Sequence, residues 1–442
     1  MAEGVRKTVK LILAAVLTYA SLVVSLAYES QFADAGGKIP LRWKSGATIT
    51  LAVSNSLKQT PNINPGSDVA GAIERSLATW EQAANIKLNF IWTDKTAINA
   101  ANSEGDGISL LTIAAAPENL ASFAGEASEL AGRTRVFFTK RGAISEADIA
   151  LNPYQKFSTD GSADTFDLQA TITHEIGHLL GLSHTDVLGA TMHPQQGKNG
   201  IYGLPAFAPR TLSDDDRAGI RSLYGAKTDV IDCCGSIAGT LTRTSGKPLA
   251  NLTIWAENEA DGRLIATSKT NETGAYNFAG LPAGNYRLFA QSSEAGKASA
   301  VKIGSVEVES DAGATLSRAV SFPPKTFNFR LVGFNGQLST VAVPVNAGRS
   351  YMIFVGGDFT AEDLAGVETS SPLLSVVSAS LAPQDYGSEA SVLSFQVNAA
   401  ENTPKGEYSL ILRRKNGEMV YLLGALTVDD VQNGWQSRFI GE

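Results

Sequence analysis

The sequence has almost no cysteine: there are two in 442 residues, and these two, Cys233 and Cys234, are neighbours. Neighbouring Cα atoms lie about 3.8 Å apart across a trans peptide bond, which is shorter than an unstrained disulfide prefers. A bridge between them would close no loop and would therefore add little stability. We expect two incidental thiols in a linker, and cores that are stabilised by packing alone.

The sequence also lacks any run of basic residues. Its 36 lysine and arginine residues are outnumbered by 44 aspartate and glutamate residues, so the net charge is −8. Nucleic acids and anionic membrane surfaces attract proteins through clustered positive charge. We therefore expect neither as a partner.

Long apolar runs are missing after residue 26. The one such run, Leu11–Leu26, follows three basic residues between positions 6 and 10, and this order is typical of a secretory signal peptide. Small residues at 25–27 and 33–35 are candidate cleavage sites. An uncleaved signal anchor is the alternative, but the run is short for a membrane span. We interpret residues 1–35 as a signal peptide and predict a secreted, extracellular protein without a stable membrane anchor.

Histidine is scarce as well, yet three of the four histidines stand within eleven positions. The stretch from His174 to His184 reads H-E-x-x-H-x-x-G-x-x-H. His174 and His178 are four residues apart, so on a helix both imidazoles project from one face, one turn apart. The alternative, core histidines satisfied by hydrogen bonds, is the usual explanation for one isolated histidine and fits three at this spacing poorly.

The neighbouring residues predict the helix that this motif needs. Asp167 is a candidate N-cap. Apolar residues then recur at helical spacing and give the helix one buried face, at Leu168, Ile172, Ile176 and Leu179. Gly181 would end the helix, because a residue without Cβ can take the left-handed conformation and turn the chain sharply. That turn would bring His184 back towards the first two histidines.

Three histidine ligands leave one position on a metal ion open, which distinguishes a catalytic zinc from a structural one. We therefore predict one zinc ion held by His174, His178 and His184. Three neutral imidazoles would lower the pKa of a zinc-bound water to about 7. Glu175 stands next to the first ligand and could take the proton of that water as general base, then deliver it to a leaving group.

Other patterns complete an α+β domain around this helix. Alternation predicts strands at 47–53, 108–113, 133–139 and 147–151. Ser67 or Asp68 can cap a helix whose apolar face carries Val69, Ile73, Leu77 and Trp80. A last helix is expected from Asp214 to Leu223.

Further motifs make residues 40–225 resemble a matrixin, the metzincin subfamily of the matrix metalloproteases and their bacterial relatives. The matching pieces are Arg42-Trp43, the segment 147–153, the Met-turn 190–194 and the closing segment 212–225. The resemblance implies a zincin-like catalytic domain over residues 38–227. It also implies endopeptidase action on protein or peptide substrates.

The resemblance assigns supporting roles too. Met192 would form an apolar floor under the metal, Arg133–Thr139 would bind an extended substrate, and Met192–Arg210 would shape a side-chain pocket. His193 stands where the family often has Tyr, and we expect packing rather than the metal to hold it. Calcium is common in matrixins, and oxygen ligands for Ca²⁺ would be available at Asp106, Asp148, Asp160 and Asp164.

Two β domains are expected after the linker. Residues 235–323 alternate turn residues with short strands, most densely at 270–286, and resemble the carboxypeptidase regulatory-like β-sandwich. Strand-like runs over 325–428 favour an immunoglobulin-like sandwich, and 429–442 form a tail. The predicted fold is thus an α+β metzincin domain followed by two all-β sandwich domains, for which no motif identifies a ligand.

Two other functions stay open beside the zinc endopeptidase. A secreted binding or adhesive protein would keep an inactive peptidase-like domain and act through its two β-sandwich modules. The intact Glu175 argues against this, because loss of the base is the easiest route to an inactive site. A structural zinc protein would need a fourth protein ligand in the open position.

Overall fold

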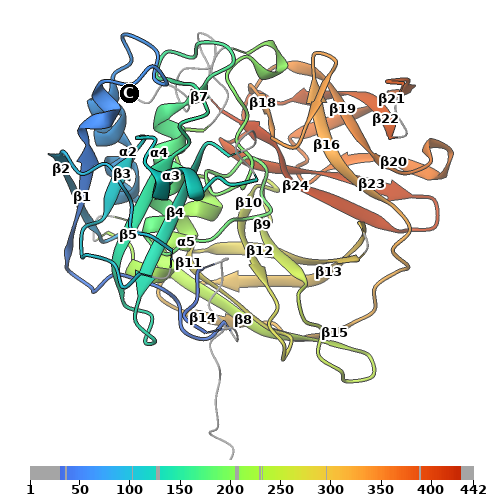
Figure 1. The fold of residues 1–442 in the computed structure, drawn as a ribbon. Coiled ribbons are helices and arrows are strands. Elements are labelled where there is room, and N and C mark those ends of the chain that lie inside the picture. Colours follow the sequence, from blue (N-terminus) through green and yellow to red (C-terminus); the bar gives the residue numbers. More distant parts are fainter. Residues whose placement is uncertain are drawn as a thin grey trace, which may run out of the picture.

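The computed structural model describes residues 30–429, except 35–36, 102, 126–129, 205–208, 228–229, 231, 295 and 388–389. Most of the predicted signal peptide and nearly all of the tail lie outside the described residues. Within the described part of the chain, no helix is long and apolar enough to cross a membrane. Figure 1 shows the α-helices in the blue and green first part, whereas the yellow to red remainder consists mostly of strands.

A five-stranded sheet forms one layer of the first domain. Its order is β2-β1-β3-β5-β4, and only β4 runs antiparallel to its neighbour. The strands are β1 (Thr48–Ser54), β2 (Lys87–Thr93), β3 (Leu110–Thr112), β4 (Gly132–Phe138) and β5 (Ile144–Leu151). The four predicted strands are confirmed. The prediction lacks β2, in which Leu88, Phe90 and Trp92 alternate towards the core.

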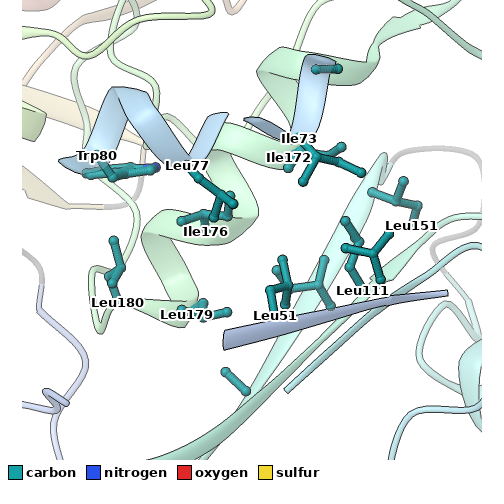
Figure 2. Close-up of a cluster of buried hydrophobic side chains, with 14 of the residues drawn as sticks. Leu51, Ile73, Leu77, Trp80, Leu111, Leu151, Ile172, Ile176, Leu179 and Leu180 are labelled. Carbon is teal, nitrogen blue, oxygen red and sulfur yellow. The ribbon is translucent and has the colours of Figure 1, made fainter. Parts of the chain in front are cut away.

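Two helices pack on this sheet. The helix α2 (Val69–Ala83) begins after Asp68, whose carboxylate accepts a hydrogen bond from the backbone N–H of Gly71. The helix α4 (Leu168–Leu179) begins after Asp167, whose carboxylate accepts one from the backbone N–H of Ala170. Figure 2 shows the core between the sheet and the two helices. The sheet contributes Leu51, Leu111 and Leu151, and the helices contribute Ile73, Leu77, Ile172 and Ile176. Trp80 is fully buried there, and its indole N–H donates to the carbonyl oxygen of Thr173.

Smaller elements complete the first domain. The helix α5 (Asp214–Tyr224) begins with a reciprocal capping box between Ser213 and Asp216. The remaining pieces are α3 (Pro117–Ala121), the short strands β6 (Phe157–Ser158) and β7 (Phe166–Asp167), and the 3₁₀ helices η1 (Asn55–Lys58) and η2 (Ile201–Gly203).

The rest of the described chain is built mostly from strands. The first group is β8 (Cys233–Arg243), β9 (Thr253–Asn258), β10 (Leu264–Lys269), β11 (Ala275–Pro282), β12 (Gly284–Glu294), β13 (Lys297–Val308), β14 (Gly313–Thr315) and β15 (Arg318–Val320). The second group is β16 (Asn328–Phe334), β17 (Gln337–Ser339), β18 (Val343–Val345), β19 (Ser350–Asp358), β20 (Leu364–Thr369), β21 (Leu374–Gln384), β22 (Ser391–Ala399), β23 (Gly406–Arg414) and β24 (Met419–Val428), with the 3₁₀ helix η3 (Ala361–Asp363).

One sheet takes strands from both of these groups. Its eight strands run in the order β13-β12-β9-β10-β23-β24-β18, with β20 paired to β23. The two groups join where Leu264 of β10 pairs with Glu407 of β23. The structure therefore confirms a β-sandwich-like region after the α+β domain, while its division into two sandwich domains stays a prediction.

The expectation of two incidental thiols is wrong. Cys233 and Cys234 form a disulfide at the start of β8. The peptide bond between them is cis, so the trans Cα spacing on which that expectation rested does not apply.

The first domain and the β region share a buried interface. Trp255 of β9 stacks on Phe289 and packs against Tyr421, and the same apolar cluster includes Val187 and Ala190 from the loop after the histidine motif. A polar contact lies beside it, because the carboxylate of Asp215 on α5 accepts hydrogen bonds from the backbone N–H and hydroxyl of Thr267.

Tyr202 holds the loop that follows the Met-turn against the β region. The side chain is fully buried, and its hydroxyl lies 3.0 Å and 2.9 Å from the carbonyl oxygens of Val332 and Val341. Its backbone N–H donates to the side chain of Gln337, and its carbonyl accepts from Asn335. The loop and the strands after residue 327 should therefore lose stability together.

We expect Tyr202→Phe to lower the free energy of unfolding by about 1–2 kcal/mol, because the one hydroxyl proton that lies between two buried carbonyl groups is lost while the ring is kept. The measurement is the midpoint of denaturant unfolding of the full chain. Tyr154→Phe is the matched control, since the Tyr154 side chain is 61% exposed and should tolerate the same change. Equal midpoints for both variants would contradict this account of the interface.

Candidate metal centre

Helix α4 carries most of the candidate site, and its start is fixed by a buried ion pair. The carboxylate of Asp167 caps the helix and also receives the guanidinium of Arg210, with 2.6 Å between Nη2 and Oδ2. Both side chains are almost completely buried. Removal of either partner would leave a buried charge without compensation, so the pair fixes where the helix begins.

The helix ends where the sequence predicts. Its last helical residue is Leu179, and Gly181 has a φ of 97°. A Cβ at Gly181 would collide with the carbonyl oxygen of Leu41. The position therefore needs glycine twice over, once for the backbone conformation and once for the close approach of another segment.

The structure brings His174, His178 and His184 together. The Nε2 atom of His178 lies 3.1 Å from the Nε2 atoms of both His174 and His184. Among the described residues, these three form the one group of at least three His, Cys, Asp or Glu that could hold a metal ion. Two nitrogen ligands at about 2.0–2.1 Å from one tetrahedral ion lie about 3.3 Å apart, so the spacing fits a shared ion.

Backbone carbonyl groups orient two of the rings. Nδ1 of His174 lies 2.7 Å from the carbonyl oxygen of Thr191, and Nδ1 of His178 lies 2.9 Å from that of Leu182. If each Nδ1 carries the proton and donates it, each Nε2 presents a lone pair to the centre of the group. Converging lone pairs repel each other unless a cation lies between them, so this donor set fits a zinc ion.

Burial keeps these histidines neutral. It lowers the pKa of His178 to about 4, with a further contribution from His184. The pKa of His174 lies well below its usual value for the same reasons, and burial also lowers the pKa of His184. Neutral imidazole is the form that binds metal ions, so the group is ready for a ligand role at neutral pH.

Glu175 lies in the same cleft as the three histidines. Burial raises its pKa to about 7, although a hydrogen bond from Thr134 opposes the rise. The hydroxyl of Thr134 on β4 donates to Oε2 of Glu175 over 2.6 Å. The neighbouring Gly132 leaves room for the carboxylate, because a Cβ there would crowd Oε1. No sequence pattern predicts Thr134 or Gly132, since the contact exists only after β4 packs on α4.

The Met-turn lies directly under α4. Met192 is buried, and a Cβ on Gly177 would collide with its sulfur atom. The carboxylate of Asp216 accepts hydrogen bonds from the backbone N–H groups of Thr191 and Met192. The capping box of α5 thus also positions the turn whose Thr191 carbonyl orients His174.

His193 lies outside this group of three histidines. The ring nitrogens of His193 lie 3.4 Å and 3.1 Å from the carbonyl oxygens of Thr185 and Thr340. The calcium prediction receives no support. Asp106 pairs with Lys95, and Asp148 accepts backbone hydrogen bonds from Asn99 and Leu110. Asp160 accepts from the backbone N–H and the hydroxyl of Ser162.

A second, mostly apolar pocket lies behind the Met-turn. On one side it is lined by residues of the first domain, namely Ala170, Leu188–Thr191, His193, Gln195–Gly197 and Pro209. On the other side it is lined by Val341, Ala342, Pro344 and Thr427 of the β region. Gln196 borders both this pocket and the cleft of the histidines. Of this lining, the segment expected to shape a pocket, Met192–Arg210, contains His193, Gln195–Gly197 and Pro209, and the sequence gives no sign of the residues from the β region.

Comparison with known proteins finds two family models along the chain. The matrixin family model matches residues 42–225, and the carboxypeptidase regulatory-like domain matches residues 236–320. Metalloendoproteinase 1 of Glycine max is 29% identical over 199 residues, which cover 42% of this chain and 53% of that protein. The hatching enzyme of Paracentrotus lividus is 28% identical over 212 residues, which cover 46% and 29% of the two chains.

Stromelysin-3 of Mus musculus is 38% identical over 101 residues, which cover 22% of this chain and 19% of that protein. The chain thus spans about half or less of the length of these relatives. Within this chain, residues 42–225 are a matrixin domain and residues 236–320 are a carboxypeptidase regulatory-like domain.

Proposed function

We propose that this protein is a zinc-dependent endopeptidase that hydrolyses peptide bonds of extracellular proteins. The observation that carries the proposal is the convergence of three imidazole Nε2 atoms in one cleft with the buried carboxylate of Glu175. Membership of the matrixin family supports the general class of metalloendopeptidase. Secretion rests on the charge and apolar pattern of residues 6–26, which lie outside the described residues.

His174, His178 and His184 would hold the metal. Zinc bound there would supply Lewis acidity. It would polarise the scissile carbonyl group and lower the pKa of a water molecule, so that the water could lose a proton and attack near neutral pH. The protein's part is to keep three neutral ligands on one side and leave the other side open to the cleft. The carbonyl groups of Thr191 and Leu182 do this by fixing two of the rings.

Glu175 would move the proton. It is outside the group of possible ligands yet lines the same cleft, so its carboxylate can take a proton from the attacking water. Thr134 holds one carboxylate oxygen and leaves the other for this task. The protonated carboxyl group then delivers the proton to the amine that leaves.

The substrate would lie along β4. This strand is the last of its sheet and contributes Gly132, Arg133 and Thr134 to the cleft. An extended peptide can pair with such an edge through main-chain hydrogen bonds. The apolar pocket behind the Met-turn would receive one substrate side chain, so the β region would help to set its size.

For the metal, we expect about one zinc ion per chain in the purified protein and loss of most of it in His184→Ala, because two ligands hold zinc much less tightly than three. The measurement is metal analysis after dialysis. His193→Gln is the matched control, since His193 contacts carbonyl groups outside the ligand group. Full zinc content in His184→Ala would show that the third ligand is misassigned.

For the base, we expect Glu175→Gln to reduce cleavage of a denatured protein substrate by about 10²–10⁴-fold, because an amide cannot accept the proton at neutral pH. Zinc content should stay unchanged, since no ligand is removed. Both quantities are measured on the same preparations. Equal cleavage would remove Glu175 as the base, and a zinc-loaded wild type that cleaves nothing in a broad substrate panel would favour a binding protein.

For the pocket, we expect Ala342→Leu to lower kcat/KM for peptides with a large apolar side chain about 10-fold relative to peptides with a small one, because the added carbons fill the space. Ala342 is nearly buried at the pocket wall, whereas Ala365 on β20 is exposed. Ala365→Leu is therefore the matched control. An unchanged preference in Ala342→Leu would show that the β region has no part in selecting the side chain.

A further inference from the structure

Residues 30–34, here called the N-terminal strap, lie against the turn between the second and third histidines. Ser30 forms an antiparallel bridge with Leu182, and Phe32 forms one with Pro40. The backbone N–H of Gln31 donates to the carbonyl oxygen of Gly181 over 2.8 Å, and its carbonyl accepts from Leu41 over 2.7 Å. The strap is therefore inserted between the turn and the segment that enters the first domain.

The side-chain amide of Gln31 contacts backbone carbonyl groups in the segment that carries the three histidines. Its Nε2 lies 3.2 Å from the carbonyl oxygen of His178 and 2.9 Å from that of Leu182. The Leu182 carbonyl also lies 2.9 Å from Nδ1 of His178. A carbonyl oxygen has two lone pairs, so it can accept from the ring and from the amide together. Gln31 thus holds the Leu182 carbonyl group, which orients the His178 ring.

The end of α4 presents carbonyl groups to several donors, and that of His178 also accepts from the backbone N–H of Gly181 over 3.0 Å. The last carbonyl groups of a helix have no partner within it and must find one elsewhere. The indole N–H of Trp43 donates to Leu179, and the hydroxyl of Tyr224 donates to Leu180. Gln31 supplies the amide donor on the side of the turn that faces the cleft, and its side chain lines that cleft with the three histidines.

We propose that Gln31 is a positioning residue for the metal centre, which sets the orientation of His178 and the turn that leads to His184. The inference rests on the proposed function, because it concerns ligands of the proposed zinc ion. Groups that hold metal ligands in place typically contribute about 10–100-fold to metal affinity. Gln31 acts one hydrogen bond further out, so we expect an effect near the lower end of that range.

The strap also bears on where the chain would be processed. Cleavage after Ala27 would keep Gln31, whereas cleavage after Ala35 would remove the whole strap. The contacts of Gln31 favour the first position. The mature N-terminus, determined by mass spectrometry on the exported protein, should therefore lie before Gln31. A mature chain that begins at Gly36 and binds zinc as tightly as a chain with the strap would overturn the inference.

The decisive experiment compares zinc dissociation constants in the full chain by competition with a chromogenic chelator. Gln31→Met keeps the length of the side chain but removes its N–H donor, and it should raise the dissociation constant about 10-fold. Ser30→Ala is the matched control in the same strap, because the buried Ser30 hydroxyl has no hydrogen-bond partner among the residues that the structure describes. It should stay within about twofold of the wild type, below the tenfold effect expected for a lost outer partner.

Cobalt substitution separates positioning from general loss of stability. The visible absorption spectrum of Co²⁺ depends on ligand geometry, so it should change in Gln31→Met and not in Ser30→Ala. A Gln31→Met variant with wild-type zinc affinity and an unchanged cobalt spectrum would overturn this inference but not the proposed function. A wild type that binds no zinc would instead overturn the proposed function, and this inference with it.

Discussion

The geometry of the candidate metal centre depends on two hydrogen bonds between imidazole Nδ1 atoms and backbone carbonyl groups. One carbonyl belongs to Thr191 in the Met-turn and the other to Leu182 in the turn after α4. With the proton on Nδ1, each bond leaves an Nε2 lone pair directed at the same point. The rest of the first domain holds these two carbonyl groups still, through Asp216 under the Met-turn and through Gln31 beside Leu182.

The β region is a structural partner of this centre. Tyr202, Trp255 and Asp215 each cross the interface with buried contacts. The carbonyl oxygen of Thr340 lies beside His193, which belongs to the Met-turn. A module that only tethered the first domain to another molecule would not need such contacts, so we infer that the β region stabilises the loop around the site.

Local sequence patterns were sufficient for the histidine helix. Asp167 caps α4, Gly181 ends it, and the three histidines meet, because capping, helical period and glycine geometry are set within a few residues. The partners of the site were out of reach of such patterns. Thr134 contacts Glu175 across 41 residues and Gln31 contacts Leu182 across 151. The disulfide at Cys233 was missed because a trans peptide was assumed.

The sequence by itself determined which three histidines come together, the helix that carries two of them and the order of an α+β domain before a β region. Each of these depends on the spacing of residue types along short stretches. Tertiary structure alone decided how the rings are oriented, which side chain holds Glu175, and that one sheet unites strands of both β groups. These features depend on which distant segments become neighbours when apolar surfaces are buried. The spacing of residues along a short stretch does not predict which segments these are.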